Sequence, residues 1–268
     1  MNIGLLIVGD EILSGKRADK HLPKVIEVLA ARGLALSWAR YVGDDPGRIT
    51  ADLKDAFASS DLVFSCGGIG ATPDDHTRQC AAAALGVPLM LHPQARDFVI
   101  ERMRDVAREQ GTPFEPDRDD NRHRLNMAVF PEGAGVIPNP YNKIAGFSVR
   151  KGEGGVFFVP GFPVMAWPMI EWVLDTVYAG IHAKSGPLER SVIVFGAMEA
   201  ALTPLMESIE SGFPGIKVFS LPSVDHPDWG RHIELGVKGD AAKLDAAYRS
   251  LLDGLNARDA KLGPELVR

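Results

Sequence analysis

The chain has 268 residues, of which 46% are hydrophobic and 24% are charged, a composition typical of a globular protein with a sizeable core. Its net charge of −6 argues against a protein that binds nucleic acid or a membrane surface with a whole face, because such a face needs a basic excess. Two cysteines, Cys66 and Cys80, indicate a reducing compartment and no disulfide framework. No run approaches the roughly 20 apolar residues of a membrane span, and the N-terminus lacks the features of a signal peptide. We therefore expect a cytoplasmic protein.

The first quarter of the chain alternates apolar strands with amphipathic helices. Strands are expected at residues 3–8, 34–42 and 61–66, because these runs are apolar throughout or alternate. Helices are expected at residues 19–32, which place their apolar residues on one face, and after Pro46, which suits a first helical position. Alternation at this spacing predicts a mostly parallel sheet covered by helices on both faces.

A glycine-rich turn follows the third of these strands. Residues 67–77 read Gly-Gly-Ile-Gly-Ala-Thr-Pro-Asp-Asp-His-Thr and lead into an alanine-rich segment. Thr72 is predicted to be the N-cap of a helix, with Pro73 at its first position and Asp75 completing a capping box. A helix beginning there would aim free N–H groups and the positive end of its dipole at the space over the glycines, which suits an anion.

Further elements complete this first domain. Residues 93–110 are expected to form a charged surface helix, and residues 116–124 a loop or a short helix. Strands follow at 136–137 and 156–159, separated by a turn-rich segment, and an aromatic-rich helix is expected at 164–178.

A second, smaller unit follows residues 179–188, which we interpret as a linker because they are rich in glycine, lysine, serine and proline. A strand, a helix, two strands and a helix are expected there, in that order, at residues 191–195, 199–209, 217–221, 232–237 and 240–255. The sequence therefore predicts two domains, an α/β domain at 1–180 and a small α+β domain at 188–258.

Two nucleotide-binding motifs are nearly matched, and we reject both. Residues 68–73 have proline where the Rossmann fingerprint needs its third glycine, and they follow the third strand, whereas that fingerprint follows the first. Residues 9–16 are one residue too long for a P-loop, and the acids within them would repel phosphate. The seven histidines show no metal-ligand spacing, so zinc is not expected.

Acidic pairs follow each of the first three strands: Asp10–Glu11, Asp44–Asp45 and Asp74–Asp75. Loops at the carboxyl ends of parallel strands gather in one crevice, where ligands bind. Like charges gathered there need a cation, and Mg²⁺ that bridges carboxylate and phosphate oxygens is the expected one. The alternative that stays open is that individual acids only cap helices, Asp44 or Asp45 before Pro46 and Asp75 in its capping box.

At these residues the sequence resembles the molybdopterin-binding (MoCF) domain superfamily, most closely the N-terminal part of the competence/damage-inducible protein A family. The G-G-x-G-x-T-x-D-D-x-T element at 67–77 is its most specific feature. The resemblance covers about residues 1–180 and extends more weakly through 188–256. Longer members continue into an amidase domain for which no residues remain here, so we expect no amidase activity. The other matching segments are residues 9–15, 42–45, 131–134, 138–139 and 160–163.

The resemblance implies a three-layer αβα domain with a mostly parallel sheet, whose crevice binds a pterin or nucleotide phosphate. In related molybdopterin adenylyltransferases, the aspartates matching Asp75 and Asp44 are important for activity. In the competence/damage-inducible branch, the domain is associated with metal-dependent pyrophosphatase activity on ADP-ribose-like dinucleotides. We accordingly expect Asp75, Asp44 and Asp10 to be catalytic, and Asp75 and Asp44 to hold Mg²⁺. The expected substrate contacts are Gly9, Glu11, Gly67, Gly68, Gly70, Thr72, Asp74, Asn139, Pro160 and Gly161.

The sequence also departs from these relatives. Ile69 stands where the adenylyltransferases commonly have threonine, Met127 where glutamine is frequent, and residues 19–21 and 142–145 differ from the usual triplet and turn. Three functions stay open: a Mg²⁺-dependent nucleotide pyrophosphatase, a non-catalytic molybdopterin-binding module, and a molybdopterin adenylyltransferase. The expected partners are a small phosphate ligand and a second copy in a homo-oligomer, a dimer by family resemblance, with neither nucleic acid nor membrane.

Overall fold

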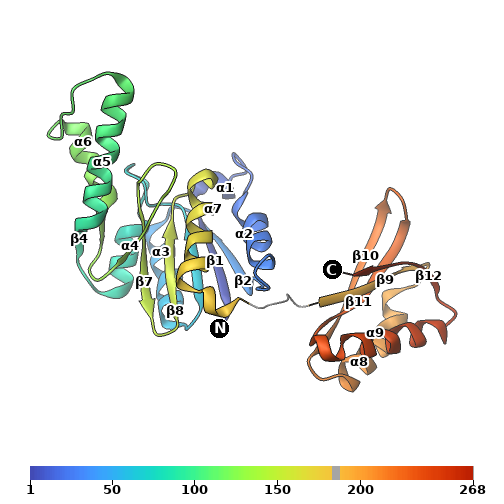
Figure 1. The fold of residues 1–268 in the computed structure, drawn as a ribbon. Coiled ribbons are helices and arrows are strands. Elements are labelled where there is room, and N and C mark those ends of the chain that lie inside the picture. Colours follow the sequence, from blue (N-terminus) through green and yellow to red (C-terminus); the bar gives the residue numbers. More distant parts are fainter. Residues whose placement is uncertain (183–187, 268) are drawn as a thin grey trace. The chain divides into compact units, whose positions relative to one another are not determined.

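The computed structural model describes residues 1–182 and 188–267, and the chain divides into two compact units, Met1–His182 and Ala183–Arg268 (Figure 1). Half of the predicted linker, residues 183–187, lies outside the described residues, whereas its first residues, Ala179–Ile181, form a short 3-10 turn. Among the described residues, none of the helices has the length and apolar character that crossing a bilayer requires. Cys66 and Cys80 form no disulfide, and both side chains are buried.

The first unit is built on a six-stranded sheet with the strand order β2-β1-β3-β8-β7-β6. The first four strands run parallel, whereas β7 pairs antiparallel with both β8 and β6. Strands β1, β3 and β8 are buried along their whole length, as strands covered on both faces are. In sheet order, the strands are Trp38–Val42, Ile3–Val8, Leu62–Cys66, Gly154–Val159, Gly146–Lys151 and Gly135–Ile137.

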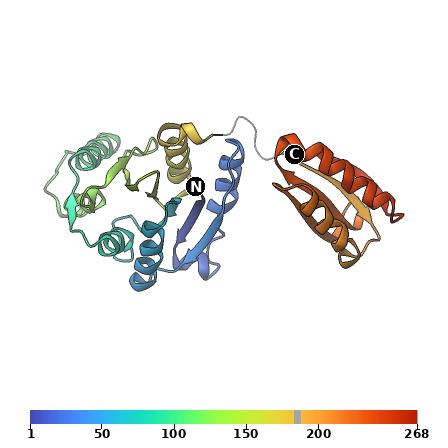
Figure 2. The ribbon, with the colours of Figure 1, turned by 90° about the horizontal axis from the view of Figure 1, so that it is seen from below.

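Helices cover both faces of this sheet, which gives the predicted three layers (Figure 2). Helices α3 (Pro46–Ala58) and α4 (Thr77–Leu85) pack on one face, and α2 (His21–Ala30) and α7 (Pro163–Trp172) on the other. Helix α5 (Pro93–Gln110) joins the first of these cores from the side, where it packs against the 3-10 turn at Leu125–Ala128. The remaining elements are α1 (Asp10–Leu13), α6 (Asp119–Arg124), a 3-10 turn (Leu125–Ala128), a π turn that continues α7 (Val173–Val177), and the paired strands β4 (Leu89–Leu91) and β5 (Val129–Pro131).

An aromatic stack lies in the core on the α3–α4 side of the sheet. The fully buried ring of Phe147 lies between those of Phe130 and Phe158, at centroid distances of 4.9 and 4.2 Å. Phe147 and Phe158 face each other on neighbouring strands, so the stack fixes the antiparallel extension of the sheet.

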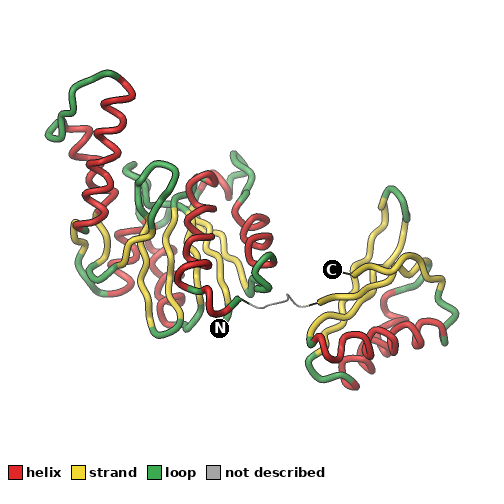
Figure 3. Tube along the Cα trace, in the orientation of Figure 1, coloured by secondary structure: helices red, strands yellow, loops and turns green. Residues whose placement is uncertain are grey.

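The second unit is a four-stranded antiparallel sheet with two helices on one face (Figure 3). Buried leucines of both helices, among them Leu205 and Leu251, form one core with Val192, Leu235 and Val237 of the sheet. The elements are β9 (Leu188–Phe195), α8 (Glu199–Gly212), β10 (Ile216–His226), β11 (Gly230–Gly239), α9 (Ala241–Asn256) and β12 (Lys261–Val267), with the sheet order β10-β11-β9-β12.

The structure differs from four expectations about secondary structure. The helix after the glycine turn begins at Thr77 and not beside Thr72, and His76 precedes it without a side-chain cap. Strand β7 occupies part of the segment expected to consist of turns, and β2 begins at Trp38, not at residue 34. Strand β12 lies beyond residue 258, where the second domain was expected to end, and was not predicted.

Candidate functional site

Four carboxylates line one pocket of about 670 Å³ beyond the carboxyl ends of the parallel strands. Asp10 and Glu11 belong to α1, which directly follows β1, while Asp44 follows β2 and Asp74 lies in the loop after β3. Because β1 is hydrogen-bonded to both β2 and β3, the loops that leave these strands meet at one edge of the sheet. Lys16 is the basic side chain in the lining.

Asp10 and Asp44 hold the two loops together by reciprocal hydrogen bonds. The backbone N–H of Asp10 donates to Oδ2 of Asp44 at 3.0 Å, and the N–H of Asp44 donates to Oδ1 of Asp10 at 3.2 Å. Burial raises the pKa of Asp44; the charges of Asp10, Glu11 and Asp74 raise it further, while the hydrogen bond from Asp10 opposes the rise. The pocket therefore concentrates negative charge that a bound cation would relieve.

The donor set of this pocket fits Mg²⁺ held jointly with a ligand. Among the residues that the structure describes, no three histidine, cysteine, aspartate or glutamate side chains converge closely enough to hold a metal ion. Mg²⁺ is commonly bound by one or two carboxylates together with water and substrate phosphates, and carboxylate oxygens are the hard ligands it prefers. Asp10 and Asp44 would be its protein ligands here.

Asp75 and Asp45 are used differently from the other members of their pairs. Oδ2 of Asp75 accepts hydrogen bonds from the N–H of Thr72 at 2.9 Å and from its Oγ1 at 2.5 Å. The expected N-cap at Thr72 is wrong because α4 begins only at Thr77. The bond from the Thr72 N–H to Asp75 that a capping box requires does form, but it closes a local turn and not the first turn of a helix. Asp45 caps α3 by accepting from the N–H of Arg48 at 2.8 Å. Neither Asp75 nor Asp45 lines the acidic pocket, whereas their neighbours Asp74 and Asp44 do.

The glycine loop lies directly against the end of β1. Gly67 and Gly68 have φ angles of +109° and +68°, which side chains rarely adopt, and a Cβ on Gly67 would lie 2.3 Å from the carbonyl oxygen of Val8. A Cβ on Gly161, in the loop after β8, would lie 3.5 Å from Cα of Gly67. The loops after β3 and β8 therefore touch through backbone, with Pro160 next to this contact.

Two buried residues at the start of α4 hold the glycine loop, and the sequence interpretation missed both. Thr77 donates to the carbonyls of Gly67 and Gly68, and Arg78 donates to those of Ile69 and Gly70. Arg78 is only 4% exposed. The sequence held one signal for Arg78, which is an arginine at the start of an otherwise alanine-rich helix. If such a side chain is buried, its charge needs hydrogen-bond partners nearby.

Asn139 is a loop-forming residue in this structure. Its Nδ2 donates to Oδ1 of Asn142 at 2.8 Å and to the carbonyl of Ile144 at 2.9 Å, and its Oδ1 accepts from the N–H of Tyr141 at 3.0 Å. With 4% exposure, its amide is committed to this turn and shapes the site through backbone position.

His21 connects α2 to the loop after β8. Its Nε2 lies 2.9 Å from the carbonyl oxygen of Gly161, so this nitrogen carries the proton, and its buried Nδ1 has no partner among the described residues. His21 therefore holds the backbone of Gly161, which is one of the expected substrate contacts. His21 belongs to the triplet 19–21, in which this sequence differs from its relatives.

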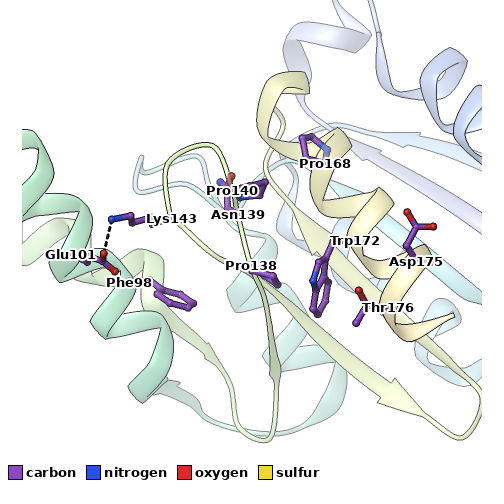
Figure 4. A pocket seen from close by; sticks show the side chains of 10 residues that line it. All are labelled: Phe98, Glu101, Pro138, Asn139, Pro140, Lys143, Pro168, Trp172, Asp175 and Thr176. Carbon is purple, nitrogen blue, oxygen red and sulfur yellow. Dashed lines mark hydrogen bonds and ion pairs between the residues drawn. The ribbon is translucent and has the colours of Figure 1, made fainter. Parts of the chain in front are cut away.

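A second pocket of about 640 Å³ lies between α5, the loop after β6 and α7 (Figure 4). Its walls are mainly apolar and aromatic, with Phe98 on α5 and Trp172 on α7. The charged residues at its rim are paired: Lys143 with Glu101 at 2.6 Å and Asp175 with Arg32 at 2.6 Å. Segments distant in sequence build this pocket, and no local pattern predicted it.

Comparison with known proteins assigns the first unit to a family. The family described as "Probable molybdopterin binding domain" matches residues 4–179. The chain belongs to this family. A CinA-like protein of Anaeromyxobacter sp. (strain K) is 35% identical over 212 residues, which cover 77% of this chain and 49% of that protein. A CinA-like protein of Geobacter sulfurreducens is 31% identical over 271 residues, covering 100% of this chain and 61% of its own length.

A solved structure supports the fold assignment. The protein CinA from Thermoplasma acidophilum, described as having unknown function, aligns with a TM-score of 0.55 and 25% identity, covering 66% of this chain and 99% of that one. The resemblance to the MoCF superfamily and to the competence/damage-inducible branch is thereby confirmed, as is the α/β fold class. This chain spans about half to three fifths of the length of the curated relatives described above.

Proposed function

We propose that the first unit binds a pterin or nucleotide through its phosphate groups together with Mg²⁺, and hydrolyses a nucleotide pyrophosphate of the ADP-ribose type. The observation that supports this proposal most is the meeting of a carboxylate-lined pocket and a glycine loop at one edge of the sheet. Membership in a molybdopterin-binding family supports the phosphate ligand. Carboxylates alone would repel phosphate, so the two features act together only with a cation between them.

The reaction would be an in-line displacement at phosphorus. A water oxygen forms a bond to one phosphorus, the bond from that phosphorus to the bridging oxygen breaks, and the departing phosphate keeps the electron pair. The proton lost by water passes to a carboxylate of the pocket, for which Glu11 is available if Asp10 and Asp44 face the metal. Mg²⁺, if bound by Asp10 and Asp44, would neutralise part of the phosphate charge. Backbone N–H groups of the glycine loop orient the substrate.

Hydrolysis of ADP-ribose, measured with Mg²⁺ and with chelator, tests this proposal. We expect AMP and ribose 5-phosphate only with the metal, and about a 100-fold lower rate for Asp44→Asn. Asp45→Asn is the matched control, because asparagine is also a good N-cap and the residue lies outside the pocket lining. Equal turnover by Asp75→Asn would remove Asp75 from the mechanism and leave it a turn residue. An active Asp44→Asn enzyme would refute the assigned role of the pocket.

A non-catalytic ligand-binding module is the second candidate. The observation that favours it concerns Asn139, one of the expected substrate contacts. Its side-chain amide makes hydrogen bonds within its own loop, so it has no polar group left for a ligand. Thermal stabilisation by a pterin or nucleotide phosphate without any product would support this candidate, whereas AMP transfer to molybdopterin would support the adenylyltransferase alternative. We also propose a homodimer, and light scattering during gel filtration tests it.

A further inference from the structure

We infer that Thr77 and Arg78 are positioning residues that turn four consecutive backbone N–H groups, those of residues 68–71, toward a phosphate group of the ligand. This inference rests on the proposed function, because it specifies how the glycine loop would receive the phosphate. It replaces the expectation that a helix starting beside Thr72 would supply these donors.

Thr77 fixes the first two peptide groups of the loop. Its N–H donates to the carbonyl of Gly68 at 3.0 Å, and its Oγ1 donates to the carbonyl of Gly67 at 3.1 Å. Thr77 is fully buried, so water does not compete for these carbonyls. A Cβ on Gly68 would lie 2.2 Å from Oγ1 of Thr77, which shows how closely the loop fits over this residue.

Arg78 fixes the next two peptide groups. Its two terminal nitrogens donate to the carbonyls of Ile69 and Gly70, each at 2.6 Å. Burial lowers the pKa of Arg78 and the charge of Asp75 opposes this effect, yet an arginine side chain keeps its proton at neutral pH. A buried positive charge therefore lies directly beneath the loop.

Because each peptide group is planar, the hydrogen bonds to the carbonyls also determine where the N–H groups of the loop point. In a planar trans peptide, the carbonyl of one residue and the N–H of the next point in opposite directions. The four carbonyls of residues 67–70 are held toward the start of α4, so the N–H groups of residues 68–71 point away from it. No described residue accepts a hydrogen bond from these four N–H groups.

Successive unpaired N–H groups form a concave surface that binds anions, and the charge of Arg78 reinforces their attraction. A phosphate group offers about three terminal acceptor oxygens in a tetrahedral arrangement, whereas a carboxylate offers two in one plane, so phosphate matches four convergent N–H groups better. The chemical class we assign to this position is one phosphate of a pyrophosphate or phosphomonoester, with the acidic pocket left for the metal.

Binding of inorganic pyrophosphate in the presence of Mg²⁺, measured by calorimetry on the full chain, tests the inference. We expect Thr77→Val and Arg78→Lys each to weaken binding about 10- to 100-fold, the effect of losing hydrogen bonds that serve a charged group. Lysine keeps the charge but loses the two-pronged geometry, so this change isolates positioning from attraction. Thr77→Ser restores the hydroxyl and should bind within about threefold of the wild type. Arg96→Lys, an exposed arginine on α5, is the control.

Amide NMR on the wild-type chain decides the question even if a variant fails to fold. We expect the N–H signals of residues 68–71 to shift together on addition of pyrophosphate. Shifts elsewhere with these four unmoved, or full affinity in folded Thr77→Val and Arg78→Lys, would overturn the inference and leave the proposed function standing. Failure of the wild type to bind pyrophosphate, ADP-ribose or a pterin phosphate would refute both.

Discussion

Replacing Asp44 by asparagine should make the metal-free first unit more stable while it disables the site. The substitution removes one of the four negative charges that line the acidic pocket. The carbonyl oxygen of asparagine can still accept the hydrogen bond that Asp10 donates at 3.0 Å, so the loop contact survives. The net change is therefore relief of the burial of a charged carboxylate and, in addition, of its repulsion by the neighbouring carboxylates.

The magnitude is modest because the pocket is open to solvent. An exposed or half-exposed charge pair contributes about 0.2–1 kcal/mol, and we expect a total gain of about 0.5–1 kcal/mol after solvent screening. For a unit of this size, that corresponds to a rise in Tm of roughly 1–4 °C. The sign follows from the raised pKa of Asp44, since the folded state disfavours its charged form.

Thermal unfolding in chelator at pH 7.5 and at pH 4 measures this gain. The gain should shrink at pH 4, because as pH falls through the raised pKa the wild-type carboxyl becomes neutral and loses its disadvantage. Added Mg²⁺ should stabilise the wild type more than the variant, since only a metal-binding native state gains from it. A lower Tm for Asp44→Asn in chelator, or a gain that persists undiminished at pH 4, would refute the reasoning.

Three further substitutions test the surrounding structure. Phe147→Ala should destabilise the first unit by about 3–5 kcal/mol, because it leaves a cavity in a fully buried aromatic stack. Calorimetry should show a lower Tm for the first unit and an unchanged Tm for the second, and a shift of both would contradict the division into two units. His21→Ala should lower the free energy of unfolding in urea by about 1–2 kcal/mol and weaken ADP-ribose binding, because the carbonyl of Gly161 loses its buried hydrogen-bond donor. Unchanged binding would mean that other contacts hold this loop. Ser65→Ala should change urea stability by less than about 0.5 kcal/mol, because the buried hydroxyl has no partner among the described residues; a loss above about 1 kcal/mol would reveal a bound water or ligand there.

The sequence predicted the parts of the fold whose signals are local. Strand β1 is apolar at each position, and Pro46 and Pro93 each begin a helix, so periodicity and proline rules place these elements correctly. Strand β12 was missed because Gly263 and Pro264 interrupt it at a register shift, and both residues normally argue against a strand.

The site was predictable as far as topology determines it. Carboxylates that follow neighbouring parallel strands do meet, and Asp10, Glu11, Asp44 and Asp74 share one pocket. The split within the pair Asp74–Asp75 was not predictable, because the helix begins at Thr77 and not at Pro73, and the turn that Asp75 closes before it is defined only by the folded loop. The role of Arg78 was hidden for the same reason, since its partners are carbonyls whose direction only the folded loop defines.

The close backbone contact between the loop at Gly67 and the loop at Gly161 has a consequence for how such a domain diversifies. The groups that we infer to face the phosphate are main-chain amides, whose chemistry is the same whatever side chains surround them. Substitutions in the neighbouring segments 19–21 and 142–145 can therefore alter the shape offered to the rest of a ligand without altering the groups that grip its phosphate. If the proposed function holds, selectivity and phosphate binding would lie in different segments of this chain, and exchanging residues 19–21 and 142–145 between relatives should transfer ligand preference.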